Sequence, residues 1–126
     1  MNEQTISRFA IILLALVMAV FGIYHFVSPQ NLITYVPSFL PAVGNLWVYI
    51  PGVAFILAAI AFITNKKVKL AAYSLAVLLF VFVLTIHLPN FLNGSNMEYR
   101  QISLINILKD TAIAAFALHI AANSSN

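Results

Sequence analysis

Three polar side chains lie within one apolar segment in the last quarter of the chain. Asn106, Lys109 and Asp110 occupy positions i, i+3 and i+4, so a helix would present them on one face. A lysine or an aspartate at the centre of a membrane helix costs about 2.5–3.5 kcal/mol on insertion scales. Lys109 and Asp110 can neutralise each other locally, and they mark the one place where the sequence puts charge inside such a segment.

Two histidines lie near the ends of two other apolar segments. His25 and His87 can donate or accept hydrogen bonds, and a histidine titrates near neutral pH. Acid–base or ligand-binding roles are therefore open to both, and simple hydrogen bonding at the level of the lipid headgroups is the alternative for each. A haem held between them is not favoured, because two histidines alone are a weak signal for haem.

Four apolar segments must position these side chains. The chain has 126 residues, of which 63% are apolar and 7% charged, whereas soluble domains are about 45–50% apolar and about 25% charged. A bilayer core about 30 Å thick needs about 20 apolar residues per helix, and the segments 9–27, 47–63, 70–88 and 103–122 meet this need. We therefore expect an all-α, integral membrane four-helix bundle that forms a single domain over residues 1–126.

Several classes of function are excluded by composition. The chain contains no cysteine, so thiol catalysis, thiolate metal sites and iron–sulfur clusters are ruled out. The net charge of +3 does not describe a basic surface for nucleic acid. Hydrolase motifs and phosphate-binding loops are absent from the sequence. We predict no catalytic residues and no metal site, and whether the chain is an enzyme stays open.

The basic residues predict an orientation in the membrane. The turn over residues 64–69 carries three lysines, and Arg8 falls on the same side in a four-span arrangement. The opposite side has Arg100 next to Glu98. Because basic loops stay on the cytoplasmic side, we expect both termini in the cytoplasm and the protein in a bacterial inner membrane.

The two connections on the opposite, outer side differ in character. The segment 28–46 is uncharged, and its Ser28–Pro29 step is typical of a helix start. We expect a short interfacial helix there that caps the outer end of the bundle. The polar segment 89–102 is expected to form an ordinary exposed loop.

This topology brings the polar residues of different segments to similar depth. A helix rises about 1.5 Å per residue, so the two histidines and the Asn–Lys–Asp group all fall in the outer third of the bundle. The Asn–Lys–Asp group is expected about 5–10 Å below the start of the fourth helix. Aromatic residues at the span ends can join them, with segment 28–46 as a lid. Such a pocket suits a quinone head group or another small polar–apolar ligand, and a purely structural network is the alternative. The candidate ligand-binding residues are Tyr24, His25, Trp47, Tyr49, His87, Asn106, Lys109 and Asp110.

Two long stretches of the sequence resemble the DoxX-like family of small four-span membrane proteins. They are FGIYHFVSPQNLITYVPSFLP at 21–41 and WVYIPGVAFILAAIAFI at 47–63, and the likeness extends through IHLPNF at 86–91 and NILKD at 106–110. Phe55 stands where that family commonly has a glutamate. The resemblance implies a membrane four-helix bundle. It also implies two functional associations, one with subunits of membrane oxidoreductases such as thiosulfate–quinone systems and one with assistance to nicotinic receptor assembly.

We therefore expect a membrane accessory component linked to redox chemistry, with a pocket for quinone or another small ligand near the outer side. The alternative is a non-enzymatic assembly factor or chaperone for other membrane proteins, which the small size and the small residues of the spans favour. A transporter of small solutes or lipids is a third hypothesis and would need a dimer. The expected partners are the lipid bilayer and either another membrane protein or a second copy of the chain.

Overall fold

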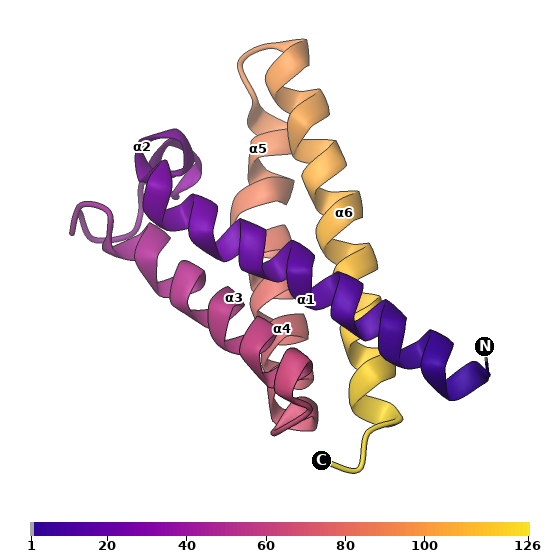
Figure 1. Cartoon of the computed structure of the whole chain (residues 1–126). Coiled ribbons are helices and arrows are strands. Elements are labelled where there is room, and N and C mark those ends of the chain that lie inside the picture. The colour runs from indigo at the N-terminus through magenta and orange to yellow at the C-terminus, as the bar shows by residue number, and fades with distance from the viewer. Residues whose placement is uncertain (1) are drawn as a thin grey trace.

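Four long helical columns make up the protein. The computed structural model describes residues 2–126, and within them the regular secondary structure is entirely helical (Figure 1). Each column is long and apolar enough to cross a bilayer, so the chain is an all-α integral membrane protein with a four-helix bundle, as predicted. The columns are α1 (Glu3–Val27), α3 (Leu46–Thr64), α4 (Val68–Phe82) continued by α5 (Leu88–Asn93), and α6 (Met97–Ala122).

The columns α1 and α3 approach each other closely at two glycines. A Cβ atom on Gly22 would lie 2.6 Å from Cγ1 of Ile56 and 2.9 Å from the carbonyl oxygen of Gly52. Helices in lipid gain nothing from apolar contact alone, so small residues that allow close packing join them. The absence of a side chain at Gly22 and at Gly52 therefore allows α1 and α3 to pack closely against each other.

The second pair consists of α4 and α6, and a shared core joins the two pairs. Figure 1 shows α1 and α3 inclined across the steeper α4 and α6, with the α5–α6 hairpin extending past them at one end. Side chains of all four columns are buried in the core, among them Met18, Phe62, Leu75 and Ala117. The two helix pairs are therefore joined by a core to which all four columns contribute.

The expectation of an exposed loop over residues 89–102 is wrong. The third column continues to Asn93, and α6 already begins at Met97, so the connection is only residues 94–96. Pro89 explains the continuation. Proline has no N–H and its ring collides with the carbonyl four residues earlier, so the helix widens into a π-helical segment, η2 (Val83–His87), and then resumes.

The segment between α1 and α3 folds over the end of the bundle opposite the α3–α4 turn. It forms the short helix α2 (Pro29–Leu32) and the 3₁₀ turn η1 (Ile33–Tyr35), in agreement with the short helix predicted there. The ring of Tyr35 stacks on that of Tyr99 in α6, with centroids 5.8 Å apart. The indole N–H of Trp47 donates to the carbonyl of Pro41 at 2.8 Å. These two contacts hold the segment against α6 and α3.

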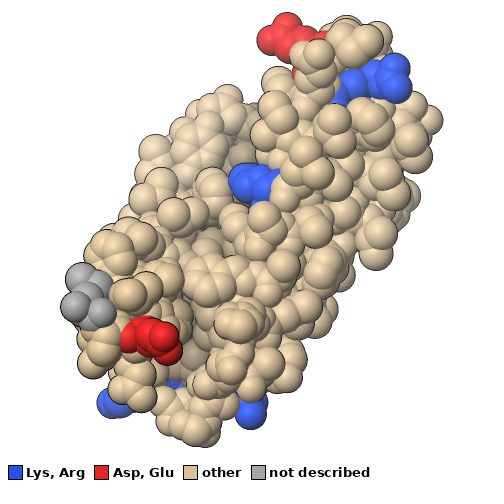
Figure 2. Space-filling model, turned by 90° about the vertical axis from the view of Figure 1, so that its right-hand side faces the viewer, with Lys and Arg blue, Asp and Glu red and all other residues tan. Residues whose placement is uncertain are grey.

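Four of the six Lys and Arg residues lie at the opposite end of the bundle, namely Arg8, Lys66, Lys67 and Lys69. The Arg8 guanidinium donates to the carbonyl of Ile63 at 2.7 Å, and the backbone N–H of Lys69 donates to the carbonyl of Asn126 at 2.7 Å. The start of α1, the α3–α4 turn and the end of the chain thus lie together. Figure 2 shows charged side chains mainly at the two ends of the molecule. The fold groups the residues on which the orientation prediction depends, and that orientation stays a prediction.

Candidate ligand-binding site

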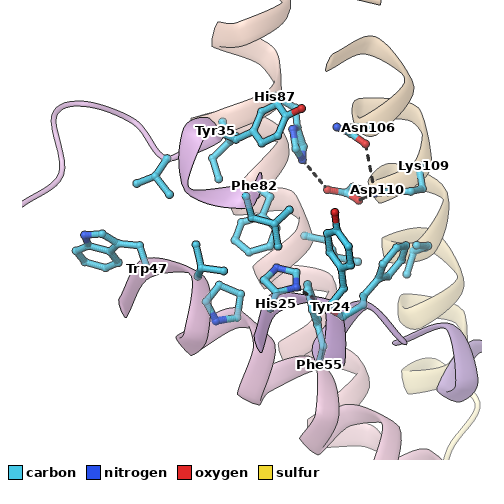
Figure 3. A pocket seen from close by; sticks show the side chains of 18 of the residues that line it. Tyr24, His25, Tyr35, Trp47, Phe55, Phe82, His87, Asn106, Lys109 and Asp110 are labelled. Carbon is cyan, nitrogen blue, oxygen red and sulfur yellow. Dashed lines mark hydrogen bonds and ion pairs between the residues drawn. The ribbon is translucent and has the colours of Figure 1, made fainter. Parts of the chain in front are cut away.

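A cavity of about 360 Å³ opens between the two helix pairs, under α2 and η1. Its walls are mostly apolar, and polar groups converge on one side of it (Figure 3). Small-molecule sites in proteins share this volume and this mixture of apolar walls and a few placed polar groups. Seven of the eight candidate residues line it: Tyr24, His25, Trp47, His87, Asn106, Lys109 and Asp110.

The eighth candidate lies outside the cavity. Tyr49 is exposed on the lipid-facing side of α3, where its ring stacks on that of Phe26 with centroids 5.4 Å apart. Trp47 lines the cavity with its ring only, because its N–H is already bonded to the loop carbonyl. Neither aromatic residue therefore supplies a polar group to a ligand.

The polar side of the cavity centres on a buried histidine–aspartate pair. Nε2 of His87 lies 3.0 Å from Oδ2 of Asp110, and the side chains are 12% and 5% exposed. An ionised carboxylate only accepts, so Nε2–H of His87 is the donor. Nδ1 of His87 and Nδ2 of Asn90 are buried without a hydrogen-bond partner among the described residues. The ring therefore keeps one nitrogen that can accept a hydrogen bond.

Lys109 joins this pair to the rest of the cavity. Its Nζ lies 3.5 Å from Oδ1 of Asp110 and donates to Oδ1 of Asn106 at 3.3 Å. The same Nζ lies 4.8 Å from the ring centroid of Phe21 in α1, which is a cation–π distance. The Lys109 charge is thus balanced by a carboxylate on its own helix while it bridges the gap to α1.

His25 faces the cavity from α1 with one nitrogen fixed. Its Nδ1 lies 2.6 Å from the carbonyl of Phe21, and since a carbonyl only accepts, Nδ1–H is the donor. The neutral ring therefore presents Nε2 as an acceptor. The ring meets Phe55 edge-on at 5.2 Å. Gly52 makes this position possible, because a Cβ there would lie 2.8 Å from Cβ of His25.

The cavity also contains hydrogen-bond donors, on α6 and on α1. The amide oxygen of Asn106 accepts from Lys109, which leaves its NH₂ group to donate to a ligand. The hydroxyl of Tyr24 accepts from Nδ2 of Asn31 at 3.3 Å, and its own proton stays available. The cavity thus combines donors and acceptors.

The depth expected for the charged group needs correction. Because α6 starts at Met97 and not near 103, Asp110 lies about 20 Å along the helix from its first residue and Asn106 about 14 Å. The group still lies near the end of α1, since the α5–α6 hairpin extends past that end (Figure 1).

Sequence reasoning did not single out several lining residues. Asn31 and Tyr35 belong to the segment expected to act as a lid, and their types gave no further signal. Phe21 and Phe82 looked like ordinary span residues, and Phe55 stood out only as a departure from the DoxX-like pattern. The packing shows that all three line the apolar wall.

The sequence model of one protein family, described as a domain of unknown function (DUF8561), matches residues 14–121. The chain belongs to this family. Every residue that lines the cavity, from Met18 to Ile113, falls inside the DUF8561 match. Searches of curated proteins and of solved structures found no significant match.

Proposed function

We propose that this DUF8561 protein is an accessory component of membrane redox chemistry that binds the head group of a quinone in its cavity. The observation that carries the proposal is the convergence of the His87–Asp110 pair, Lys109 and His25 on an apolar-walled cavity inside a membrane bundle. Buried ionisable groups in a membrane protein are expensive and usually functional. The resemblance to the DoxX-like family, with its redox-associated members, points in the same direction.

The donors of the cavity match the oxidised form of the ligand. A quinone has two carbonyl oxygens, which only accept hydrogen bonds. The NH₂ group of Asn106, the ammonium of Lys109 and the hydroxyl of Tyr24 can donate to them. Phe55 and Phe82 supply flat apolar surfaces for the ring.

The acceptors of the cavity match the reduced form. Reduction of a quinone consumes two electrons and two protons and leaves two hydroxyl groups, which can donate. Nε2 of His25 can accept from one of them, and the His87–Asp110 pair holds a proton-exchanging group close by. The electrons must come from a partner oxidoreductase in the membrane, so this chain binds and orients the quinone and exchanges protons with it.

The assembly-factor alternative finds no specific support in the packing. Its motivation was the small residues of the spans, and most of these are buried inside the chain itself, including Gly22, Gly52, Ala59 and Ala114. They account for the close approach of the protein's own helices. Recovery of a recurring membrane protein partner by crosslinking, without any bound quinone, would favour this alternative.

The test is ligand recovery and stabilisation with the full chain. The protein is purified from native membranes in mild detergent, bound lipids are extracted, and thermal unfolding is followed with a benzoquinone that lacks a side chain. We expect quinone in the extract and a rise in melting temperature that grows with concentration. His25→Ala should lose this stabilisation and His119→Ala, at the other end of the bundle, should keep it. No quinone in the extract together with no stabilisation of the wild type would refute the proposal.

A further inference from the structure

A second cavity of about 310 Å³ lies between α3 and α4, below the chain that follows η1. Its walls are almost wholly apolar, and the hydroxyl of its one threonine, Thr85, already donates to the carbonyl of Val81 at 2.6 Å. The second cavity therefore offers a ligand hydrocarbon contact and essentially no hydrogen bonds.

The two cavities share part of their walls. Five residues line both of them: Val36, Trp47, Pro51, Phe82 and Ile86. The charged groups of α6 therefore lie on one side of this shared aromatic and aliphatic wall. The apolar space between α3 and α4 lies on the other side.

The outer rim of the second cavity faces the bilayer. Ile50 on α3 and Val81 on α4 are 52% and 46% exposed, and Phe39 in the overlying segment is 75% exposed. In a four-span protein these apolar side chains meet lipid and not water. The space between α3 and α4 thus faces the membrane interior on one side and shares a wall with the first cavity on the other.

We infer that the second cavity holds the hydrocarbon tail of the quinone and is the lateral route by which that quinone leaves the bilayer for the site. This inference rests on the proposed function. A quinone with an isoprenoid or alkyl tail has a polar head followed by an apolar chain, which matches the polar first cavity and the apolar second cavity beside it. Because lipid is as apolar as the cavity, the tail gains little free energy there. The cavity directs the tail, and the head group supplies the affinity.

A tail-labelled probe tests where the tail lies. A benzoquinone carrying a decyl chain with a diazirine at its end is bound to the full-length protein in lipid nanodiscs and activated by light, and the labelled residues are mapped by mass spectrometry. We expect label concentrated on residues 78–86 of α4 and η2 and on Ile50, and at least a tenfold loss of that label when excess benzoquinone without a tail is added. Leu78→Trp, which fills the second cavity, should reduce the label several-fold, and Leu70→Trp, on an exposed part of the same helix, should not.

The outcomes separate this inference from the proposed function. Label spread evenly over exposed apolar residues would show that the tail lies in bulk lipid, and it would overturn the inference even if benzoquinone without a tail still stabilises the protein. Label on 78–86 that excess benzoquinone does not displace would overturn it too, because the cavity would then hold ordinary acyl chains. Failure of both the tailed and the tailless compound to stabilise the protein would instead refute the proposed function.

Discussion

The imidazole of His87 donates through Nε2 to the carboxylate of Asp110 across 3.0 Å, and this bond joins the π-helical segment of the third column to the middle of α6. Both side chains are largely buried. Lys109 contacts the second carboxylate oxygen at 3.5 Å, so Asp110 has a partner on each side. An aspartate buried in an apolar bundle depends on such partners, because an unpaired charge there is costly.

Removal of the carboxylate should destabilise the bundle. Asp110→Ala leaves His87 without its acceptor and Lys109 without its counter-charge, and loss of one partner from a buried pair costs about 3–5 kcal/mol. Asp110→Asn should cost less, because the amide oxygen still accepts from His87. Equilibrium unfolding in mixed micelles measures both, with Glu98→Ala in the exposed first turn of α6 as control. If Asp110→Ala lowers the free energy of unfolding no more than Glu98→Ala does, the His87–Asp110 pair does not stabilise the bundle.

Pro89 should be required for the position of His87. Pro89→Ala restores an N–H that can donate to the carbonyl of Thr85, so the π turn can narrow to a regular α-helical turn and rotate His87 away from α6. A double-mutant cycle with His87→Ala and Asp110→Ala measures the coupling between the two side chains. We expect a coupling of about 1–3 kcal/mol in the natural sequence and less than about 0.5 kcal/mol in the Pro89→Ala background. Equal coupling in both backgrounds would show that Pro89 does not set the geometry.

Gly22 should tolerate no side chain. A Cβ there would lie 2.6 Å from Ile56 and 2.9 Å from the backbone carbonyl of Gly52, so Gly22→Ala must push α1 away from α3. Overpacking of this kind costs about 1–3 kcal/mol. Adding Ile56→Ala should recover only part of the loss, because the backbone carbonyl stays in place. Thermal unfolding of the single and double variants checks this, and full recovery in the double variant would mean that the close contact with Gly52 is unimportant.

The orientation prediction can be tested cleanly because the chain has no cysteine. Single substitutions Lys66→Cys in the α3–α4 turn and Asn96→Cys in the α5–α6 turn place one thiol at each end of the bundle. In intact cells a membrane-impermeant maleimide should label only the variant at position 96, and after permeabilisation it should label both. The reverse pattern would show that the basic end faces outward.

The four columns were predictable from the long apolar segments of the sequence. A segment that crosses lipid must satisfy its own backbone hydrogen bonds, and a helix does so. The convergence of His25, His87 and the Asn106–Asp110 face was foreseeable from the topology and the approximate depth of each residue, although the depth along α6 was underestimated because α6 begins at Met97. This is why one cavity receives residues that lie far apart in the sequence.

The α5–α6 hairpin was not foreseeable in the same way. The segment around Pro89 and Gly94 has the composition of a loop, and a helix continues there only because a π turn accommodates the proline and α6 packs alongside. Tyr49 was misplaced for a related reason. Its depth matched the site, but the direction in which a side chain leaves a helix depends on the packing of α1 against α3, and no spacing rule supplied that.

Fluorescence of the single tryptophan tests the central claim most directly, because Trp47 lines the cavity and no other tryptophan contributes signal. A benzoquinone is titrated into the wild-type protein and into two variants, all in nanodiscs. Asn106→Leu loses a donor inside the cavity, and the control Gln101→Leu loses an exposed amide on the same helix. We predict saturable quenching in the wild type and in Gln101→Leu, with at least a tenfold weaker apparent affinity in Asn106→Leu. Quenching that rises linearly without saturation, and equally in all three proteins, would contradict a quinone site in this cavity.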